Sequence, residues 1–254
     1  MKLVVLGDPV AHSRSPAIQT AALEACGIQG SYTARRVDEA GMVRAVDEVR
    51  YGRLSGANVT MPHKQIAFEL ADRVSEEALR SGAVNTLAGR GGEVWGHNTD
   101  VEGIRAVWRS AALPTDRPVL ILGTGGAAAG VVVAVADRAL TVSGRRDRAA
   151  TDLLTRTRAV GSTVPWGTPV EGAVVVNATP IGMNAELLPS SVLDVASGFF
   201  DLTYASVESP SIVYTRGLGI PTADGKELLL AQAAASFQIW TGVPAPTDVM
   251  RAAF

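Results

Sequence analysis

The chain has little of several features that would point to membranes, nucleic acid or secretion. Cys26 is the single cysteine among 254 residues, which excludes an intramolecular disulfide and suits a reducing compartment. Basic and acidic residues nearly balance, 23 against 25, so no basic excess is available for binding nucleic acid. No apolar run is long enough to span a bilayer, and three scattered histidines (His12, His63, His97) with one cysteine are too few for a structural zinc site. We therefore expect a soluble, cytoplasmic protein without a metal.

The composition is that of an ordinary globular protein. Apolar residues make up 47% of the chain and charged residues 19%, and the length allows one large domain or two modest ones. Near the amino terminus the apolar run Leu3–Leu6 follows Lys2 but stops at Gly7-Asp8-Pro9, which is too short for the apolar core of a signal peptide. The run predicts a first buried strand instead.

Strand and helix patterns alternate through the first half of the chain. Ser15-Pro16 is expected to open a helix, because proline is favoured in the first turn and Gly27 stands just past the end. Gly89–Gly92 predicts a hairpin turn. The expected strands are 2–6, 31–37, 56–60, 84–88 and 93–95, and further helices are expected near 40–49, from 63, and from 99 to about 111.

A domain boundary is expected near Leu113–Pro118, a polar stretch that contains proline. Beyond it we expect buried strands at 119–122, 140–143, 173–176 and 198–202, a small-residue helix from 127 to about 138, and a long amphipathic helix at 225–240. Strands that are apolar on both faces are typical of a parallel sheet covered by helices. The sequence therefore predicts an α/β fold.

A glycine-rich turn joins the strand at 119–122 to the helix that follows it. In Gly123-Thr124-Gly125-Gly126-Ala127 the first glycine permits a tight turn, and the next two allow a pyrophosphate to approach the backbone at a helix N-terminus. A glycine turn without a ligand is the simpler alternative. The strand before it and the helix after it favour a dinucleotide site.

The residues after the next strand bear on which dinucleotide is bound. An NAD site normally places an acidic residue there to hold the ribose hydroxyls. Here Gly144 is followed by Arg145, Arg146, Asp147 and Arg148, and guanidinium groups suit a 2′-phosphate. A solvated basic helix start, with Asp147 placed for the helix dipole, is the alternative. We expect NADP in preference to NAD.

Four short polar motifs lie close to expected strand ends in the first half. Each has a structural explanation taken alone: Ser15 and Asp100 as helix N-caps, and Lys64 as a helix-surface lysine. The motifs are Ser13-Arg14-Ser15-Pro16, Asn58-Val59-Thr60-Met61-Pro62-His63-Lys64, Gly82-Ala83-Val84-Asn85-Thr86 and Asn98-Thr99-Asp100.

Together and in this order, these motifs resemble the shikimate dehydrogenase family. The match covers nearly the whole chain, and it includes the glycine turn and several further strings. These are Gly7-Asp8-Pro9-Val10-Ala11-His12, Asn177-Ala178-Thr179-Pro180-Ile181-Gly182-Met183, Ala223-Asp224-Gly225 and Leu230-Ala231-Gln232-Ala233.

The resemblance implies an α/β architecture with an N-terminal α/β substrate domain, a Rossmann-type dinucleotide-binding domain, and a cleft between them. Residues 1–112 and 225–254 would form the substrate-binding and catalytic domain, and residues 113–224 the NADP-binding domain. The implied activity is the reversible, NADP-dependent reduction of 3-dehydroshikimate to shikimate in aromatic amino acid (chorismate) biosynthesis. The expected partners are these small molecules, with no nucleic acid and no membrane, and a homodimer is left open.

The resemblance also implies roles for individual residues. Ser13, Ser15 and Tyr204 would hold the substrate carboxylate, and Lys64 and Asp100 would form the catalytic pair. The ring hydroxyls would be bound by Asn58, Thr60, Asn85, Asp100 and Gln232. The cofactor would be bound by Gly123, Thr124, Gly125, Gly126, Ala127, Arg145, Arg146 and Arg148, with Thr179, Leu202 and Gly225 along its nicotinamide side.

These residue types suit the implied chemistry. A site that hydrogen-bonds each hydroxyl of a ring acid rejects analogues that lack one. A lysine ammonium beside the ketone oxygen stabilises the negative charge that develops as hydride arrives, and it donates the proton. Asp100 beside it favours the charged lysine and positions lysine and substrate.

The sequence also departs from the family pattern. NADP-dependent members usually carry Asn-Arg-Thr where this chain has Gly144-Arg145-Arg146, and Arg148 follows one residue sooner. Lys226-Glu227 replaces a more apolar pair that contains glycine. Two alternatives remain open, a quinate/shikimate dehydrogenase that uses NAD and a non-catalytic relative that binds the ring acid.

Overall fold

The structure, a computed structural model, describes residues 1–146, 148–204 and 207–254. Two compact units are present, one formed by Met1–Gly103 with Leu229–Phe254 and the other by Ile104–Leu228. The chain passes from one unit to the other within two helices, α5 (Thr99–Ser110) and α10 (Gly225–Thr241). Asp147, expected in a first helical turn, lies outside the described residues. Within these ranges no helix combines the length and the apolar character needed to cross a bilayer.

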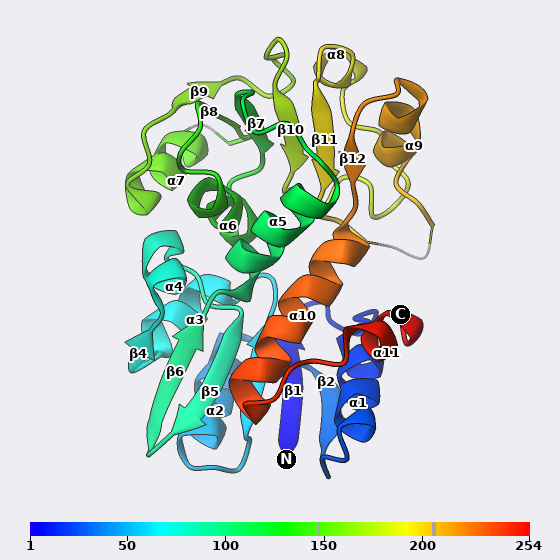
Figure 1. The fold of residues 1–254 in the computed structure, drawn as a ribbon. Helices are drawn as coiled ribbons and strands as arrows, with labels where there is room; N and C mark the ends of the chain where they lie inside the picture. Colours follow the sequence, from blue (N-terminus) through cyan, green and yellow to red (C-terminus); the bar gives the residue numbers. More distant parts are fainter. Residues whose placement is uncertain (147, 205–206) are drawn as a thin grey trace. The chain divides into compact units, whose positions relative to one another are not determined.

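The first unit is built on a mixed six-stranded sheet with the order β2-β1-β3-β5-β6-β4 (Figure 1). The strand β1 pairs in parallel with its neighbours β2 and β3, whereas β5 runs antiparallel to both β3 and β6. The strands are β1 (Lys2–Gly7), β2 (Ser31–Arg36), β3 (Gly56–Val59), β4 (Arg73–Val74), β5 (Thr86–Arg90) and β6 (Glu93–His97). The expected hairpin is present, and Gly91 and Gly92 between β5 and β6 both have positive φ, as a two-residue turn requires.

The helices of the first unit begin and end where capping chemistry favours it. Asp38 accepts a hydrogen bond from the Gly41 amide at the start of α2 (2.7 Å), and Ser75 accepts one from the Ala78 amide at the start of α4 (3.2 Å). Gly27, with φ of +65°, follows the end of α1. The helices are α1 (Ser15–Ala25), α2 (Glu39–Arg50), α3 (Lys64–Leu70), α4 (Glu76–Ser81) and α11 (Thr247–Ala252). The Arg14 guanidinium lies 5.7 Å from the centre of the Phe254 ring where α1 and α11 pack together (Figure 1).

The second unit is built on a parallel sheet with the order β12-β11-β10-β7-β8-β9. Its central strands are buried along their whole length, as strands covered by helices on both faces must be. The strands are β7 (Val119–Leu122), β8 (Leu140–Ser143), β9 (Ser162–Val164), β10 (Val174–Asn177), β11 (Gly198–Asp201) and β12 (Thr222–Ala223). The helices are α6 (Gly126–Ala134), α7 (Ala149–Thr157), α8 (Ser190–Leu193) and α9 (Pro210–Gly217). The predicted α/β fold with a parallel, helix-covered sheet is confirmed.

For two expected elements the structure explains why the observed bounds differ. The helix expected to reach about residue 138 ends at Ala134, because the chain turns there and the Arg138 amide donates to the Val135 carbonyl (3.1 Å). The strand expected from Val84 begins at Thr86, because the Val84 amide donates to the Lys64 carbonyl (2.8 Å) and not to a neighbouring strand.

Candidate active site

The four polar motifs meet at one edge of the first sheet. The strands β1 and β3 are parallel, so the loop with Ser13 and Ser15 and the residue Thr60 both follow strand ends at the same edge. Because β5 runs antiparallel to β3, its first residue, Thr86, lies opposite Asn58. Thr86 also lies opposite His97, so the end of β6 delivers Asn98, Thr99 and Asp100 to this edge. Topology alone thus gathers side chains that are up to 87 positions apart in the sequence.

Lys64 and Asp100 form a close ion pair at this edge. The Lys64 Nζ atom is 2.6 Å from Asp100 Oδ2, and the two side chains are 16% and 12% exposed. Asp100 lies in the first turn of α5, where a helix N-terminus stabilises a carboxylate. Its other oxygen, Oδ1, accepts a hydrogen bond from Asn85 Nδ2 (2.9 Å). The pair is therefore partly shielded from water, and Asn85 fixes the orientation of the carboxylate.

A buried network of hydroxyl and amide groups supports this pair. Asn85 Oδ1 accepts from the Thr99 amide (2.8 Å), and its Nδ2 donates to Thr99 Oγ1 (3.0 Å). The α10 helix contributes Ser236, whose hydroxyl donates to the Gln232 carbonyl (2.9 Å) and contacts Thr86 Oγ1 (2.8 Å). Gln232 itself reaches the network through its Oε1, 3.5 Å from Thr99 Oγ1.

Sequence reasoning missed part of this network. Thr86 and Thr99 stand inside the motifs quoted above but received no role, although a hydroxyl beside each site residue was a usable signal. Ser236 follows Gln232 by four residues on a predicted helix, a spacing that places both on one face. No signal in the sequence marked Tyr32, whose hydroxyl donates to Asn58 Oδ1 (2.6 Å).

The other candidate residues of the first unit lie either at the site or in the structure that supports it. Ser15 is buried, and its amide donates to Ser13 Oγ at 3.3 Å. Thr60 is half-buried at the end of β3. His63 is buried and its Nε2 lies 2.8 Å from the Val37 carbonyl, an arrangement that holds the start of α3 in place.

In the second unit the glycine turn has the geometry that a pyrophosphate needs. Gly123 has φ of +120°, and a Cβ there would lie 2.6 Å from the Ala178 carbonyl oxygen, so only glycine fits. Gly125 is the N-cap of α6, and a Cβ there would meet open space among the described residues. The first-turn amides of α6 are thus accessible to an anion, which the helix dipole also favours.

The tip of β8 presents exposed arginines beside this turn. Arg145, Arg146 and Arg148 are all exposed. A Cβ at Gly144 would lie 2.8 Å from Thr124 Cγ2, which accounts for glycine at this position when threonine occupies the turn. Arg156 was not predicted from the sequence. It donates to the Thr124 carbonyl (3.0 Å) and the Gly125 carbonyl (3.2 Å), and so stabilises the conformation of the turn.

The other residues expected to bind the cofactor follow the ends of neighbouring strands. Thr179 donates through its hydroxyl to Asn177 Oδ1 (2.7 Å) at the end of β10, and Leu202 follows β11. A Cβ at Gly225 would lie 2.2 Å from the Thr203 carbonyl oxygen, so the start of α10 packs directly on the backbone after β11. All of these groups lie at the carboxyl edge of the parallel sheet, where the strand order reverses between β7 and β10 and where such sheets bind ligands. Tyr204 is half-buried on the same loop as Leu202.

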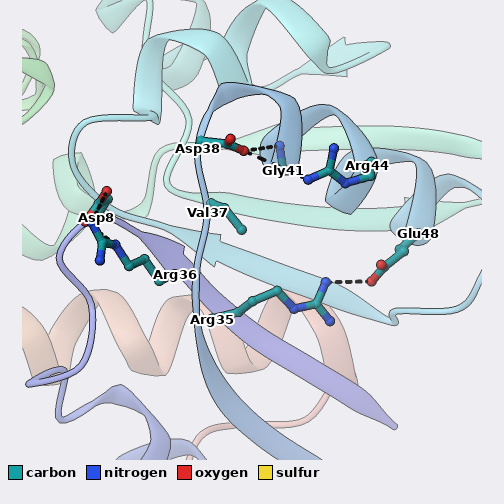
Figure 2. A pocket seen from close by; sticks show the side chains of 8 residues that line it. All are labelled: Asp8, Arg35, Arg36, Val37, Asp38, Gly41, Arg44 and Glu48. Atoms are coloured by element: carbon teal, nitrogen blue, oxygen red, sulfur yellow. Dashed lines mark hydrogen bonds and ion pairs between the residues drawn. The ribbon is translucent and has the colours of Figure 1, made fainter.

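A hollow of about 440 Å³ opens elsewhere on the first unit, between the end of β2 and the start of α2 (Figure 2). Its three arginines each face a carboxylate: Arg35 and Glu48 at 2.8 Å, Arg36 and Asp8 at 2.8 Å, and Arg44 and Asp38 at 3.9 Å. The charges of these side chains balance. The described residues that line the hollow therefore carry no net positive charge that would attract an anionic substrate.

Comparison with known proteins agrees with the resemblance. The pattern of the shikimate dehydrogenase substrate binding domain matches residues 5–87, and that of the shikimate 5′-dehydrogenase C-terminal domain matches residues 225–253. The NADP(+) shikimate dehydrogenase of Methanocella arvoryzae is 36% identical over 97% of this chain and 95% of its own. The shikimate 5-dehydrogenase of Thermus thermophilus, solved with NADP(H) and shikimate, is 32% identical, with a TM-score of 0.89 over 100% of this chain and 98% of its own. The chain therefore belongs to the shikimate dehydrogenase family.

Proposed function

We propose that this protein is an NADP-dependent shikimate dehydrogenase, which interconverts 3-dehydroshikimate and shikimate in aromatic amino acid biosynthesis. The observation that carries the proposal is the ion pair between Lys64 Nζ and Asp100 Oδ2 at 2.6 Å, held beside a cluster of hydroxyl and amide groups. Relatives that are at least 32% identical over nearly the whole chain carry this activity in their names.

In the reductive direction Lys64 donates a proton from Nζ to the ketone oxygen. The ammonium also stabilises the negative charge that develops on that oxygen. Asp100 holds the lysine in place through the ion pair, and the hydrogen bond from Asn85 fixes the orientation of the carboxylate. Ser13, Ser15 and Tyr204 hold the carboxylate of the ring acid. Its hydroxyls are bound by Asn58, Thr60, Asn85, Asp100 and Gln232.

The residues of the second unit fit NADP. The uncapped first turn of α6 suits the pyrophosphate, and exposed Arg145, Arg146 and Arg148 suit the 2′-phosphate. When bound, the cofactor supplies the hydride and takes it back in the reverse reaction. Thr179, Leu202 and Gly225 orient its nicotinamide end.

Domain roles, location and assembly belong to the same proposal. Residues 1–112 and 225–254 serve substrate binding and catalysis, and residues 113–224 serve the cofactor. A cytoplasmic location is supported by the single cysteine. A homodimer is the assembly to test, by size-exclusion chromatography with light scattering.

The decisive experiment follows NADPH formation by its absorbance with purified protein, shikimate and NADP⁺. We expect the variant Lys64→Met to lower kcat by roughly 10²- to 10⁴-fold, because it keeps an unbranched side chain of similar size but removes the proton donor. Binding of shikimate should weaken by much less. Lys2→Met, at an exposed strand residue, is the matched control and should keep wild-type turnover. Equal losses in turnover and binding would reduce Lys64 to a binding group.

Cofactor and substrate choice separate the proposal from its alternatives. A higher kcat/KM with NAD⁺ or with quinate would favour the quinate/shikimate dehydrogenase. Tight binding of shikimate without any turnover would favour the non-catalytic relative. Retention of both Lys64 and Asp100 as a close pair supports an enzyme.

A further inference from the structure

We propose that Arg156 is a positioning residue that holds the glycine turn in the conformation that binds the pyrophosphate of the dinucleotide, and that it does not itself contact the cofactor. This inference rests on the proposed function and adds to it a residue from the end of α7. It follows from where the guanidinium places its hydrogen bonds and from the geometry of the peptides that accept them.

Arg156 reaches away from its own helix to the glycine turn. An arginine in the last turn of a helix can hydrogen-bond the last carbonyls of that helix. Arg156 lies in the last turn of α7, but its Nη2 donates to the carbonyls of Thr124 (3.0 Å) and Gly125 (3.2 Å), 32 and 31 positions earlier in the chain. The Gly125 carbonyl also accepts from the Ala129 amide at 3.0 Å, the first hydrogen bond of α6. One guanidinium thus holds both the turn and the start of α6.

The peptides that Arg156 holds present their amides on the opposite side. Both peptides are trans, and the C=O and N–H bonds of a planar trans peptide point in opposite directions. A guanidinium on the carbonyls of Thr124 and Gly125 therefore directs the amides of Gly125 and Gly126 away from itself. Among the described residues neither amide donates to a protein acceptor. Arg156 thus fixes the direction of two N–H groups that are placed to bind an anion at the start of α6.

The positive charge of Arg156 is half-buried, and no carboxylate of the described residues lies within ion-pair distance of it. Burial lowers the pKa of the guanidinium, and Asp152 on the same helix opposes this effect, but an arginine side chain in a protein stays charged. Its Nε is buried and has no hydrogen-bond partner in the described part of the chain, which costs stability. The charge adds to the attraction of the α6 dipole for an anion, so it serves binding better than it serves the fold.

Direct contact with the 2′-phosphate is the competing role for Arg156, because other arginines beside the turn are proposed to bind that group. The two roles predict different selectivity. NADP and NAD share the pyrophosphate, so the loss of a residue that positions the turn weakens the binding of both. The loss of a ligand to the 2′-phosphate weakens NADP alone and lowers the preference for it.

Calorimetric titration with NADP⁺ and with adenosine 2′-phosphate tests the role, because the second ligand has the 2′-phosphate but no pyrophosphate. We expect Arg156→Met to raise the Kd for NADP⁺ by about 10- to 100-fold, the range for losing charge-assisted hydrogen bonds. The Kd for adenosine 2′-phosphate should change by less than about threefold. Arg109→Met, at an exposed arginine in the last turn of α5, is the matched control and should leave both Kd values unchanged. Equal weakening of the two ligands would mean direct contact with the 2′-phosphate and would overturn the proposal.

Turnover with the two cofactors gives a second readout. Arg156→Met should lower kcat/KM for NADP⁺ and for NAD⁺ by factors that agree within about threefold, mainly through KM, so that the preference between them is kept. A loss confined to NADP⁺ would contradict the proposal.

A conservative variant keeps the test readable if Arg156→Met does not fold. Arg156→Lys keeps the charge but replaces the planar guanidinium by a shorter side chain with a compact ammonium group. We expect its Kd for NADP⁺ to rise by about 3- to 10-fold, with the Kd for adenosine 2′-phosphate again within about threefold of wild type. A lysine variant that binds NADP⁺ as tightly as wild type would overturn the role of the guanidinium.

The outcomes also separate this inference from the proposed function. A purely structural role would lower the melting temperature of Arg156→Met and leave its Kd for NADP⁺ at the wild-type level below that temperature, which would contradict positioning. If wild-type protein binds NADP⁺ but does not turn over shikimate, the proposed function fails and the binding data still decide the role of Arg156. If wild type turns over and Arg156→Met binds NADP⁺ as wild type does, the positioning role alone fails.

Discussion

At the scale of single residues, the half-buried His97 of the first unit and the buried Asp201 of the second respond to pH in opposite senses. Burial lowers the pKa of His97, and Arg90 lowers it further against a weaker opposing effect of Glu77. Burial raises the pKa of Asp201, against hydrogen bonds from Thr203 and Asn177. Each shift changes how many protons the folded protein binds relative to the unfolded chain, and so makes stability depend on pH.

His97 should contribute to acid sensitivity. Its Nε2 is buried and has no hydrogen-bond partner among the described residues, so the folded state favours the neutral ring. Between the lowered pKa and the ordinary value of 6.5 the unfolded chain binds more protons than the folded one, so stability falls as pH drops through this window. The variant His97→Gln should flatten the fall. Melting temperatures of both proteins from pH 7 down to pH 5 check this, and parallel curves would contradict it.

Asp201 should act in the other direction. Its carboxylate is fully buried at the end of β11, and Oδ1 accepts from Asn177 Nδ2 at 2.9 Å. The raised pKa means that the folded protein binds this proton more tightly than the unfolded chain does. The contribution of Asp201 to the stability of the fold therefore falls as pH rises from about 3.8 through its pKa in the folded state. Asp201→Asn keeps the acceptor atom and removes the charge. Its melting temperature relative to wild type should therefore improve as pH rises from 4 to 7, and a constant difference would refute the assignment.

The sequence predicted individual site residues unevenly. Lys64, Asp100 and Asn85 stood in recognisable motifs, and the structure brings them together. Tyr32 and Arg156 could not be predicted, because their roles arise from contacts with residues 26 and 32 positions away, respectively, and no local pattern records such contacts. Asn58 was found by its motif, but its hydrogen bond to Ser236 of α10 could not be predicted, because the two residues are 178 positions apart.

At the scale of elements, the packing of α10 on the first sheet depends on one glycine. A Cβ at Gly56 in β3 would lie 2.3 Å from Trp240 Nε1 and 2.7 Å from the Leu87 carbonyl oxygen. Trp240 Nε1 also donates to that carbonyl at 2.9 Å, so the indole has little freedom to retreat. The glycine therefore sets how closely the helix and the sheet approach each other.

Replacing this glycine should destabilise the protein. We expect Gly56→Ala to lower the free energy of unfolding by about 1–3 kcal/mol, the cost typical of overpacking. Gly217→Ala is the matched control, since a Cβ there meets no described atom within 4 Å, and it should be neutral or stabilise by about 0.4–1 kcal/mol. Urea unfolding of both variants gives the comparison. A stable Gly56→Ala protein would show that the indole can move.

Strongly patterned elements bounded by turn residues were the easiest to predict. The bounds of β7 and β8 agree with expectation, since continuous apolar runs between turn residues leave little choice. The short elements β4, β9, β12, α4 and α11 were not predicted, because none of them is a continuous apolar run and tertiary contacts decide them. The end of α6 was misplaced for the same reason, as no capping residue marks Ala134.

At the scale of the whole molecule, cofactor binding should appear as a difference in thermal stability. A ligand that binds only the folded state at about 100 times its Kd adds about 2.7 kcal/mol. For a protein of this size that corresponds to a rise in Tm of about 5–10 °C. We expect NADP⁺ to give such a rise at concentrations where NAD⁺ gives little. Joint replacement of Arg145, Arg146 and Arg148 by alanine should make the rise in Tm equal for the two cofactors. An unchanged preference for NADP⁺ would mean that other groups bind its 2′-phosphate.

The two sheets also bear on how this protein behaves at high concentration. An exposed sheet edge can recruit a strand from another molecule, and long flat edges are the most hazardous. The second sheet ends on β9 and β12, of three and two residues, and the first ends on the two-residue β4 and on β2, which carries Arg35 and Arg36. Edges this short or this charged are poor templates for intermolecular pairing. The architecture that presents the catalytic groups thereby also resists aggregation.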